Sequence, residues 1–244
     1  MKTLLLANIY KLSKSKSVIG SLICLNLYII AVYTANINWV RTNNADMQVV
    51  LHETSSLTLM VHYLVFCIII GIHIAGEFRN GLIRNAISIG KSRFDVFLSL
   101  YFSASLITVT FFFMSSVTLL IVIITMENFK SINWINVAWF GLVYFSNYLA
   151  LTATFAFISF ISKNFAVAIT FCFIYTLIPF LLYGLTSELF FVNIFPHFHI
   201  YAYITPRHTI MSSSFLLEGV IKSIVYFLAL AFIGNLIFKR SEIK

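Results

Sequence analysis

Residues 97–125 of the chain read FLSLYFSASLITVTFFFMSSVTLLIVIIT, without one charged side chain. About 20 apolar residues in an α-helix are enough to cross the hydrocarbon core of a bilayer. This run is longer than that minimum, so such a helix would cross at a tilt or begin in the headgroup layer. The stretch predicts a membrane-spanning helix.

The composition of the whole chain agrees with a membrane protein. Of its 244 residues, 60% are hydrophobic and 10% are charged, against about 45–50% and about 25% in an average soluble domain. The mean hydropathy is +0.96. These values exclude an ordinary soluble domain, and they exclude a disordered chain, which needs low hydrophobicity. With 26 Phe but only 9 Gly and 3 Pro, the chain is not fibrous, which leaves an integral membrane protein.

Five more apolar runs of spanning length accompany residues 97–125. We therefore expect an all-α, polytopic membrane protein with one transmembrane domain over residues 1–244 and six transmembrane helices. The expected spans are residues 18–40, 56–75, 97–125, 135–161, 165–185 and 220–238. Residues 41–55 and 188–218 are then the long connections on one side. The second is rich in aromatic residues, which predicts a re-entrant or interfacial segment.

Lys and Arg are distributed unequally between the two sides of these spans. One side receives twelve of the sixteen basic residues and three of the eight acidic ones, a net charge of +9, and the other side is left with −1. The positive-inside rule places the basic side in the cytoplasm. The chain is thus expected to be a multi-pass membrane protein with its N- and C-termini cytoplasmic. The charges are too scattered for a nucleic-acid-binding face.

Residues 1–16 predict a short helix at the membrane surface. Leu5, Ile9 and Leu12 recur at helical spacing, and basic residues lie elsewhere on the wheel. Such a helix suits the inner headgroup layer. A basic flank that only sets the topology is the alternative.

Residues 76–93, GEFRNGLIRNAISIGKSR, form the most informative connection. They hold four basic residues and two glycines suited to turns, while Ala86, Ile87 and Ile89 give a short apolar face. A compact, charged helix of this kind at the cytoplasmic surface suits docking of a soluble partner. Residues 90–92 read GKS, but a phosphate-binding loop needs glycine where Asn85 stands. We therefore expect no nucleotide site in this chain, and any ATP dependence must come from another polypeptide.

The six spans, the basic N-terminal helix and the loop at residues 76–93 resemble the permease subunits of type-2 ABC exporters. The resemblance is strongest to compact bacterial permeases that move antimicrobial or toxic peptides, including lantibiotic-immunity permeases. It covers the whole chain in topology, and in motifs mainly residues 1–17 and 76–93. The small size and the Ile, Asn, Lys and Phe bias are typical of a low-GC Gram-positive bacterium. The resemblance therefore implies that the chain lies in a bacterial plasma membrane.

The resemblance implies that the loop after the second span contains a coupling helix, over residues 77–93, that docks on an ATP-binding subunit. By position, the docking residues would be Glu77, Arg79, Asn80, Gly81, Arg84, Asn85, Gly90 and Arg93. Leu82 departs from the threonine that the family often has, and Asn8 from an acidic residue. These departures affect particular polar contacts. For Arg79 and Arg84, the alternative is a role in topology and in binding lipid headgroups.

The resemblance further implies a transport subunit that is not an enzyme by itself and holds no cofactor. Its expected partners are two ATP-binding subunits that carry ATP and Mg²⁺, a second permease as homo- or heterodimer, membrane lipid and a hydrophobic peptide cargo. The function would then be to expel amphipathic peptides, either toxins for export or antimicrobial peptides for self-protection. The alternatives are a lipid or drug exporter permease, an intramembrane enzyme or an ion-coupled carrier. The last usually needs ionisable groups within spans, and spans one, three, four and five have none mid-span.

Other chemistry-bearing residues in the chain favour structural roles. Cys24, Cys67 and Cys172 lie in apolar runs and are predicted to be free thiols, buried as small hydrophobic side chains. His62 and His73 share a helix face, three turns apart, but no second set of haem ligands exists in another span. The outer histidines predict no metal site, since no acidic or cysteine ligand is fixed near them. We expect Glu218 and Lys222 to pair at helical spacing. Polar uncharged side chains in the spans are expected to bond helix to helix or to line a pathway; these are Asn26, Ser103, Thr108, Ser115, Ser116, Asn147, Thr152 and Thr154.

Overall fold

The computed structural model describes residues 2–43, 47–125, 134–185 and 213–241. Every regular element in these ranges is an α-helix, which confirms the all-α expectation. The elements are α1 (Lys2–Ser13), α2 (Lys16–Asn43), α3 (Met47–Arg79), α4 (Leu82–Ser88), α5 (Arg93–Thr125), α6 (Trp134–Ser162), α7 (Phe165–Leu185) and α8 (Ser213–Arg240).

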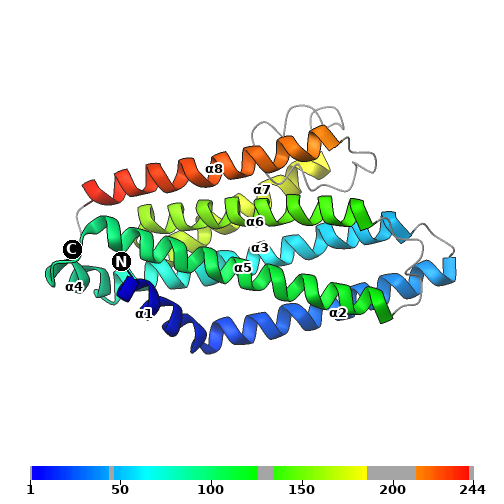
Figure 1. Ribbon diagram of the computed structural model, residues 1–244, viewed down its shortest axis with the longest axis horizontal. Coiled ribbons are helices and arrows are strands. Elements are labelled where there is room, and N and C mark those ends of the chain that lie inside the picture. Colours follow the sequence, from blue (N-terminus) through cyan, green and yellow to red (C-terminus); the bar gives the residue numbers. More distant parts are fainter. Residues whose placement is uncertain (1, 44–46, 126–133, 186–212, 242–244) are drawn as a thin grey trace.

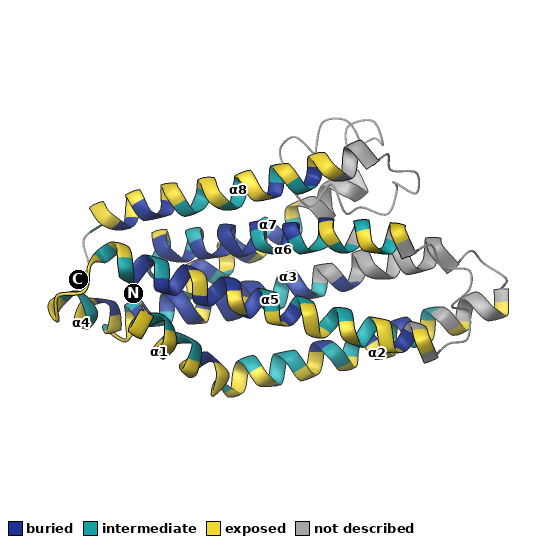
Figure 2. Cartoon of the chain, in the orientation of Figure 1, coloured by how far each residue is buried: buried dark blue, intermediate teal, exposed yellow. Residues whose placement is uncertain are grey.

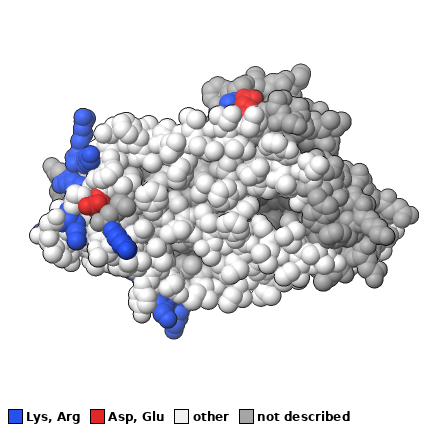
Figure 3. Space-filling model, in the orientation of Figure 1, with Lys and Arg blue, Asp and Glu red and all other residues white. Residues whose placement is uncertain are grey.

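The long helices lie side by side, and the short helices α1 and α4 lie together at one end (Figure 1). The chain's N- and C-terminal ends lie at this same end. Lys and Arg side chains gather there on the visible face (Figure 3). We call it the basic end; its basic residues are Lys2, Lys11, Lys14, Lys16, Arg79, Arg84, Lys91, Arg93, Lys163, Lys239 and Arg240.

Five helices of the described chain are long and apolar enough to cross a membrane, so the protein is a multi-helical membrane protein. Their spanning segments are Lys16–Asn36, Val61–Arg79, Arg93–Val122, Val137–Ser162 and Leu217–Arg240. The remaining expected span coincides with α7, of which Phe165–Ile178 is apolar helix.

The connection expected over residues 41–55 is largely helical, so that expectation is wrong. Helix α2 continues to Asn43, and α3 begins at Met47. A helix can continue past its apolar run, because its backbone hydrogen bonds do not depend on apolar side chains. Of the expected interfacial segment 188–218, residues 213–218 open α8, and the others lie outside the described residues.

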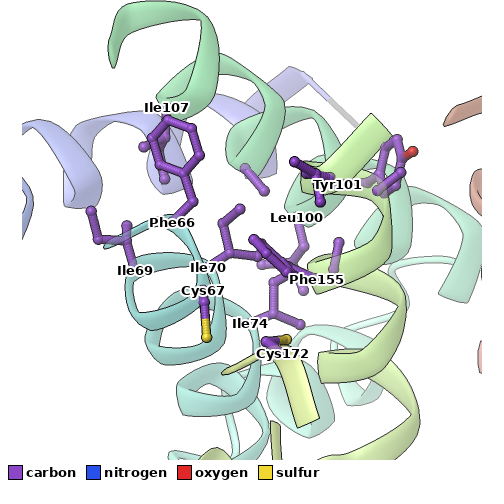
Figure 4. Packing of buried hydrophobic residues seen from close by; sticks show 14 of the residues in the cluster. Phe66, Cys67, Ile69, Ile70, Ile74, Leu100, Tyr101, Ile107, Phe155 and Cys172 are labelled. Atoms are coloured by element: carbon purple, nitrogen blue, oxygen red, sulfur yellow. The ribbon is translucent and has the colours of Figure 1, made fainter. Parts of the chain in front are cut away.

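Helices α3 and α6 form the centre of the bundle. Sixty-one per cent of the spanning window is buried in each, against 17% in α2 and in α8, and Figure 2 shows the outward faces of those outer helices exposed. The core between α3, α5, α6 and α7 is apolar and closely packed (Figure 4), with Phe66, Ile70, Leu100 and Phe155 nearly inaccessible. Many of the exposed residues on the outer helices are Ile, Leu, Val or Phe, which suits a surface that faces lipid.

Two glycines lie where neighbouring helices approach each other closely. A Cβ added at Gly71 of α3 would lie 3.1 Å from the Ile169 side chain of α7, and one at Gly234 of α8 would lie 3.3 Å from the Phe97 ring of α5. Small residues at such contacts are typical of membrane helix packing. These two glycines therefore fix how closely α7 and α8 approach the bundle.

Several polar side chains of the spans bond one helix to another. Thr108 of α5 and Thr152 of α6 share a hydrogen bond of 2.6 Å. The Thr118 hydroxyl of α5 donates to the Asn26 amide oxygen of α2 at 2.5 Å. This confirms for Asn26, Thr108 and Thr152 the helix-to-helix role expected from the sequence, and Thr118 adds a partner that the sequence did not single out.

The three cysteines are free thiols, as the sequence predicts. Cys67 and Cys172 are buried in the core, whereas Cys24 is exposed on α2, so its expected burial is wrong. The expected pair between Glu218 and Lys222 is confirmed on α8, at 2.5 Å.

Candidate functional site

The candidate site is the segment from the end of α3 to the start of α5, which contains α4. Glycines bound α4 on both sides. Gly81 precedes it with φ 68° and Gly90 follows it with φ 89°, a region that glycine enters without steric cost. After the helix, the Lys91 N–H donates to the Ala86 carbonyl and the Gly90 N–H to the Ile87 carbonyl. This Schellman pattern ends the helix sharply, and it confirms both glycines as turn residues.

Helix α4 is fixed to the bundle by one apolar face. Ile83 is buried, and Ala86 and Ile87 pack against the same core. The three residues are spaced at i, i+3 and i+4, which places them on one side of a helix. Ile89, which the sequence placed on this face, is 79% exposed, so that part of the prediction is wrong.

The opposite face of α4 is polar and exposed. Arg84, Asn85 and Ser88 point away from the bundle, and Lys91 follows in the turn. The Ser88 hydroxyl donates to the Asn85 carbonyl at 2.8 Å, so it is bound within the helix. Arg84 and Asn85 therefore present the side chains that a soluble partner could contact.

Glu77 lies in the last turn of α3, four residues before Gly81, and its side chain is buried. Its carboxylate pairs with the Lys11 ammonium of α1, and the Glu77 side chain is 7% exposed while that of Lys11 is 51% exposed. The Asn8 amide of α1 also donates to the Ser99 hydroxyl of α5 at 3.4 Å. Glu77 therefore attaches α1 to α3, a role that its position in the loop did not indicate.

Arg93, at the start of α5, also has a partner within the chain. Its guanidinium Nη1 donates to the carbonyls of Lys239 and Ser241, both at 2.8 Å. The last carbonyls of a helix have no partner inside it, and a cation there also suits the helix dipole. Arg93 thus ties the start of α5 to the end of α8.

The eight residues assigned to docking divide into three groups. Arg84 and Asn85 lie exposed on α4, with Arg79 and Asn80 exposed just before it. Gly81 and Gly90 shape the helix ends, and Glu77 and Arg93 hold α1 and α8.

A second polar arrangement lies inside the bundle, between α3 and α5. The His62 Nδ1 lies 2.7 Å from the Thr58 carbonyl, and Nε2 lies 2.8 Å from the Ser115 hydroxyl. The carbonyl can only accept, so Nδ1 carries the proton and Nε2 accepts from Ser115. Beside this pair is a cavity of about 80 Å³ lined by Tyr33 and Ser116 among others.

A matching pair lies toward the basic end of the same two helices. His73 Nε2 lies 2.7 Å from the Ser103 hydroxyl. The two pairs confirm that His62 and His73 share the face of α3 that meets α5. The periodicity showed this shared face, and the serines opposite it could be found only from the packing.

In the ranges that the structure describes, no three His, Cys, Asp or Glu side chains come together as metal ligands would. A scan against models of known protein families gives no match to the chain. A search of curated proteins gives no match either. The site is therefore interpreted from its own geometry and from the membrane-spanning fold.

Proposed function

We propose that the chain is the membrane-spanning permease subunit of an ATP-driven ABC exporter, with α4 as the helix that couples it to the ATP-binding subunit. The observation that carries this proposal is the build of α4. It is a short helix ended by Gly81 and Gly90, packed on the core through Ile83, with Arg84 and Asn85 exposed at the basic end. A helix fixed on one face and polar on the other can transmit a push from a soluble partner.

The contacts around α4 supply a route for that motion. When two ATP-binding subunits close on ATP, each α4 moves with the subunit that it contacts. The Lys11–Glu77 pair carries the displacement to α1 and α3, and Arg93 carries it to the end of α8. Two permeases then shift against each other, and the cargo leaves outward.

Helix α7 completes six spans in this proposal. It has 21 residues, about 31 Å at 1.5 Å per residue, close to the ~30 Å hydrocarbon core. Two ends of the chain at one end of the bundle (Figure 1) require an even number of crossings. A phosphatase reporter fused after Ser187 should be active outside the cell, and one fused after Lys163 inactive. The reverse result, or equal activity, would contradict six spans with the basic end inside.

The cargo that we favour is an amphipathic peptide, a toxin or an antimicrobial peptide, for export and self-protection. Exposed Ile, Leu and Phe along the outer helices suit an apolar cargo that enters sideways from the membrane. A lipid or a drug would use the same route. Transport of fluorescent peptide against fluorescent lipid by vesicles that hold the complex separates these cargoes.

Co-purification tests the central proposal. The chain is expressed with an ATP-binding subunit encoded beside it, and the stoichiometry and ATPase activity of the complex are measured. Arg84→Glu should weaken the complex at least about tenfold, since it reverses a charge at the contact. Arg240→Glu, at the same end but on α8, is the control and should leave it intact. No stoichiometric ATPase, or an Arg84→Glu complex of full strength, would contradict the coupling role.

The Ser115–His62 pair supports one second function, an intramembrane hydrolase. A nucleophile, a base and an acceptor that orients the base are arranged as in hydrolases with a serine nucleophile. A fluorophosphonate probe distinguishes the two functions. Labelling that is lost in Ser115→Ala but kept in Ser103→Ala would favour the hydrolase, and the absence of labelling leaves the pair as a bond between helices.

A further inference from the structure

A cavity of about 320 Å³ opens at the basic end, between the α1–α2 junction, the end of α3 and the start of α7. It is separate from the exposed face of α4. Neither the docking of an ATP-binding subunit nor the cargo route of the proposed function uses it.

The lining of this cavity has two distinct parts. Its apolar wall comes from four different helices and consists of Leu12, Val18, Ile69, Ile72 and Phe165. Its polar part is rich in hydrogen-bond donors and carries a net positive charge, and it consists of Lys11, Ser15, Ser17, His73, Glu77, Arg79 and Asn80. An amphiphile with an apolar tail and an anionic, hydrogen-bonding head matches both parts.

The charge of the polar part favours an anion. Lys11 and Arg79 contribute two positive charges, and Glu77 contributes one negative charge that is already paired with Lys11. Arg79 is exposed, and no described residue bonds its guanidinium. A guanidinium of this kind offers a planar fork of donors that matches two phosphate oxygens.

The position of the cavity identifies where that anion comes from. The amphipathic helix α1 meets the spanning helix α2 at Ser15 and Ser17, so this junction lies at headgroup depth. We propose that the cavity binds one anionic phospholipid of the leaflet at the basic end, with its phosphate at Arg79 and an acyl chain along the wall formed by Ile69, Ile72 and Phe165.

This proposal separates two arginines that sequence reasoning treated alike. Arg79 lines the cavity, whereas Arg84 does not and lies on the outer face of α4. Arg79 therefore binds lipid and Arg84 is left for a soluble partner.

Gly76 provides a way to fill the cavity without disturbing the fold. It lines the cavity, and a Cβ added there meets no atom within 4 Å. Gly141, inside α6, is equally open but lies outside the cavity. Leu is a better helix former than Gly, and thermal unfolding of Gly76→Leu and Gly141→Leu checks that each variant keeps the parent fold before its lipid binding is compared.

Native mass spectrometry of the purified full chain in detergent tests the proposal. Dioleoyl phosphatidylglycerol, dioleoyl phosphatidylcholine and glycerol 3-phosphate are titrated separately. Phosphatidylglycerol should saturate one tight site per chain, and glycerol 3-phosphate should not bind measurably, since it lacks the acyl chain. One basic residue near an anionic lipid is worth about 1 kcal/mol, or about fivefold in affinity.

The variants give the decisive comparison. Arg79→Gln should weaken phosphatidylglycerol binding about fivefold, and Gly76→Leu should abolish the tight site. Arg84→Gln and Gly141→Leu are the matched controls and should bind as the parent chain does. Equal binding of the two phospholipids, an equal loss in Arg84→Gln, full binding by Gly76→Leu, or glycerol 3-phosphate as tight as the lipid would each overturn the site. None of these outcomes depends on an ATP-binding subunit, so a failure here leaves the exporter proposal standing.

Discussion

The pair between Lys11 and Glu77 makes an asymmetric prediction about stability. Lys11→Met leaves the carboxylate in its buried position without the ammonium, whereas Glu77→Gln leaves a lysine that water can reach. Breaking a buried ion pair from one side costs about 3–5 kcal/mol, and an exposed pair contributes about 0–1 kcal/mol. With Glu77 7% and Lys11 51% exposed, we expect about 2 kcal/mol for Lys11→Met and under about 1 kcal/mol for Glu77→Gln.

Thermal unfolding of the purified chain at pH 7 measures both changes. For a chain of this length, 1 kcal/mol shifts the midpoint by about 2–4 °C, so Lys11→Met should lower it by about 4–8 °C. The double variant should recover part of that loss, because the buried charge is gone. Lys2→Met, which removes an exposed charge at the start of the same helix, is the control. Equal losses in the two single variants, or a larger loss in Glu77→Gln, would refute the reasoning.

Three further predictions concern packing and helix ends. Arg93→Gln should lower the stability of the contact between α5 and the end of α8 by about 1 kcal/mol, because it removes the charged donor. Trypsin should then cut after Arg240 about fivefold faster, as 1 kcal/mol corresponds to about fivefold. An unchanged rate of cleavage would contradict the role of Arg93 in holding the end of α8. Gly71→Ala should lower the thermal midpoint, since the added Cβ meets the Ile169 side chain at 3.1 Å and overpacking costs about 1–3 kcal/mol. Gly141→Ala is the control and should raise the midpoint slightly, because its Cβ lies in open space. The opposite order of the two midpoints would show that α7 is free to shift. Ser115→Ala should destabilise the chain by about 0.6–1.7 kcal/mol, as for other hydrogen bonds between membrane helices, also measured by thermal unfolding; no change would mean that water replaces the hydroxyl.

The helices of this protein could be predicted because hydropathy is a strong local signal. The expected spans 97–125 and 135–161 fall within α5 (Arg93–Thr125) and α6 (Trp134–Ser162). The prediction was wrong over residues 41–55, where α2 continues to Asn43 and α3 begins at Met47, because polar residues such as His52 and Glu53 end an apolar run but do not end a helix. Hydropathy reports the part of a helix that lies in hydrocarbon, and a helix in water needs no such signal.

The candidate site could be predicted only in its local features. Gly81 and Gly90 were identified as turn residues because glycine in a short charged connection has few other uses, and both have positive φ. The partners of Glu77 and Arg93 lie 66 and 146 residues away along the chain. No periodicity within one helix contains that information, since it depends on which helices become neighbours.

Positive charge at the basic end therefore does not form one docking surface. A count of Lys and Arg predicts which end stays in the cytoplasm, because every cation contributes alike to insertion. After folding the same cations differ, since Lys11 pairs with Glu77, Arg93 bonds the end of α8, and Arg79 lines the cavity. Arg84 remains exposed on a helix that is rigidly held. A soluble partner that docks here would have to recognise the shape of α4 and the exposed Arg84 and Asn85, because Lys11 and Arg93 are already bonded within the bundle.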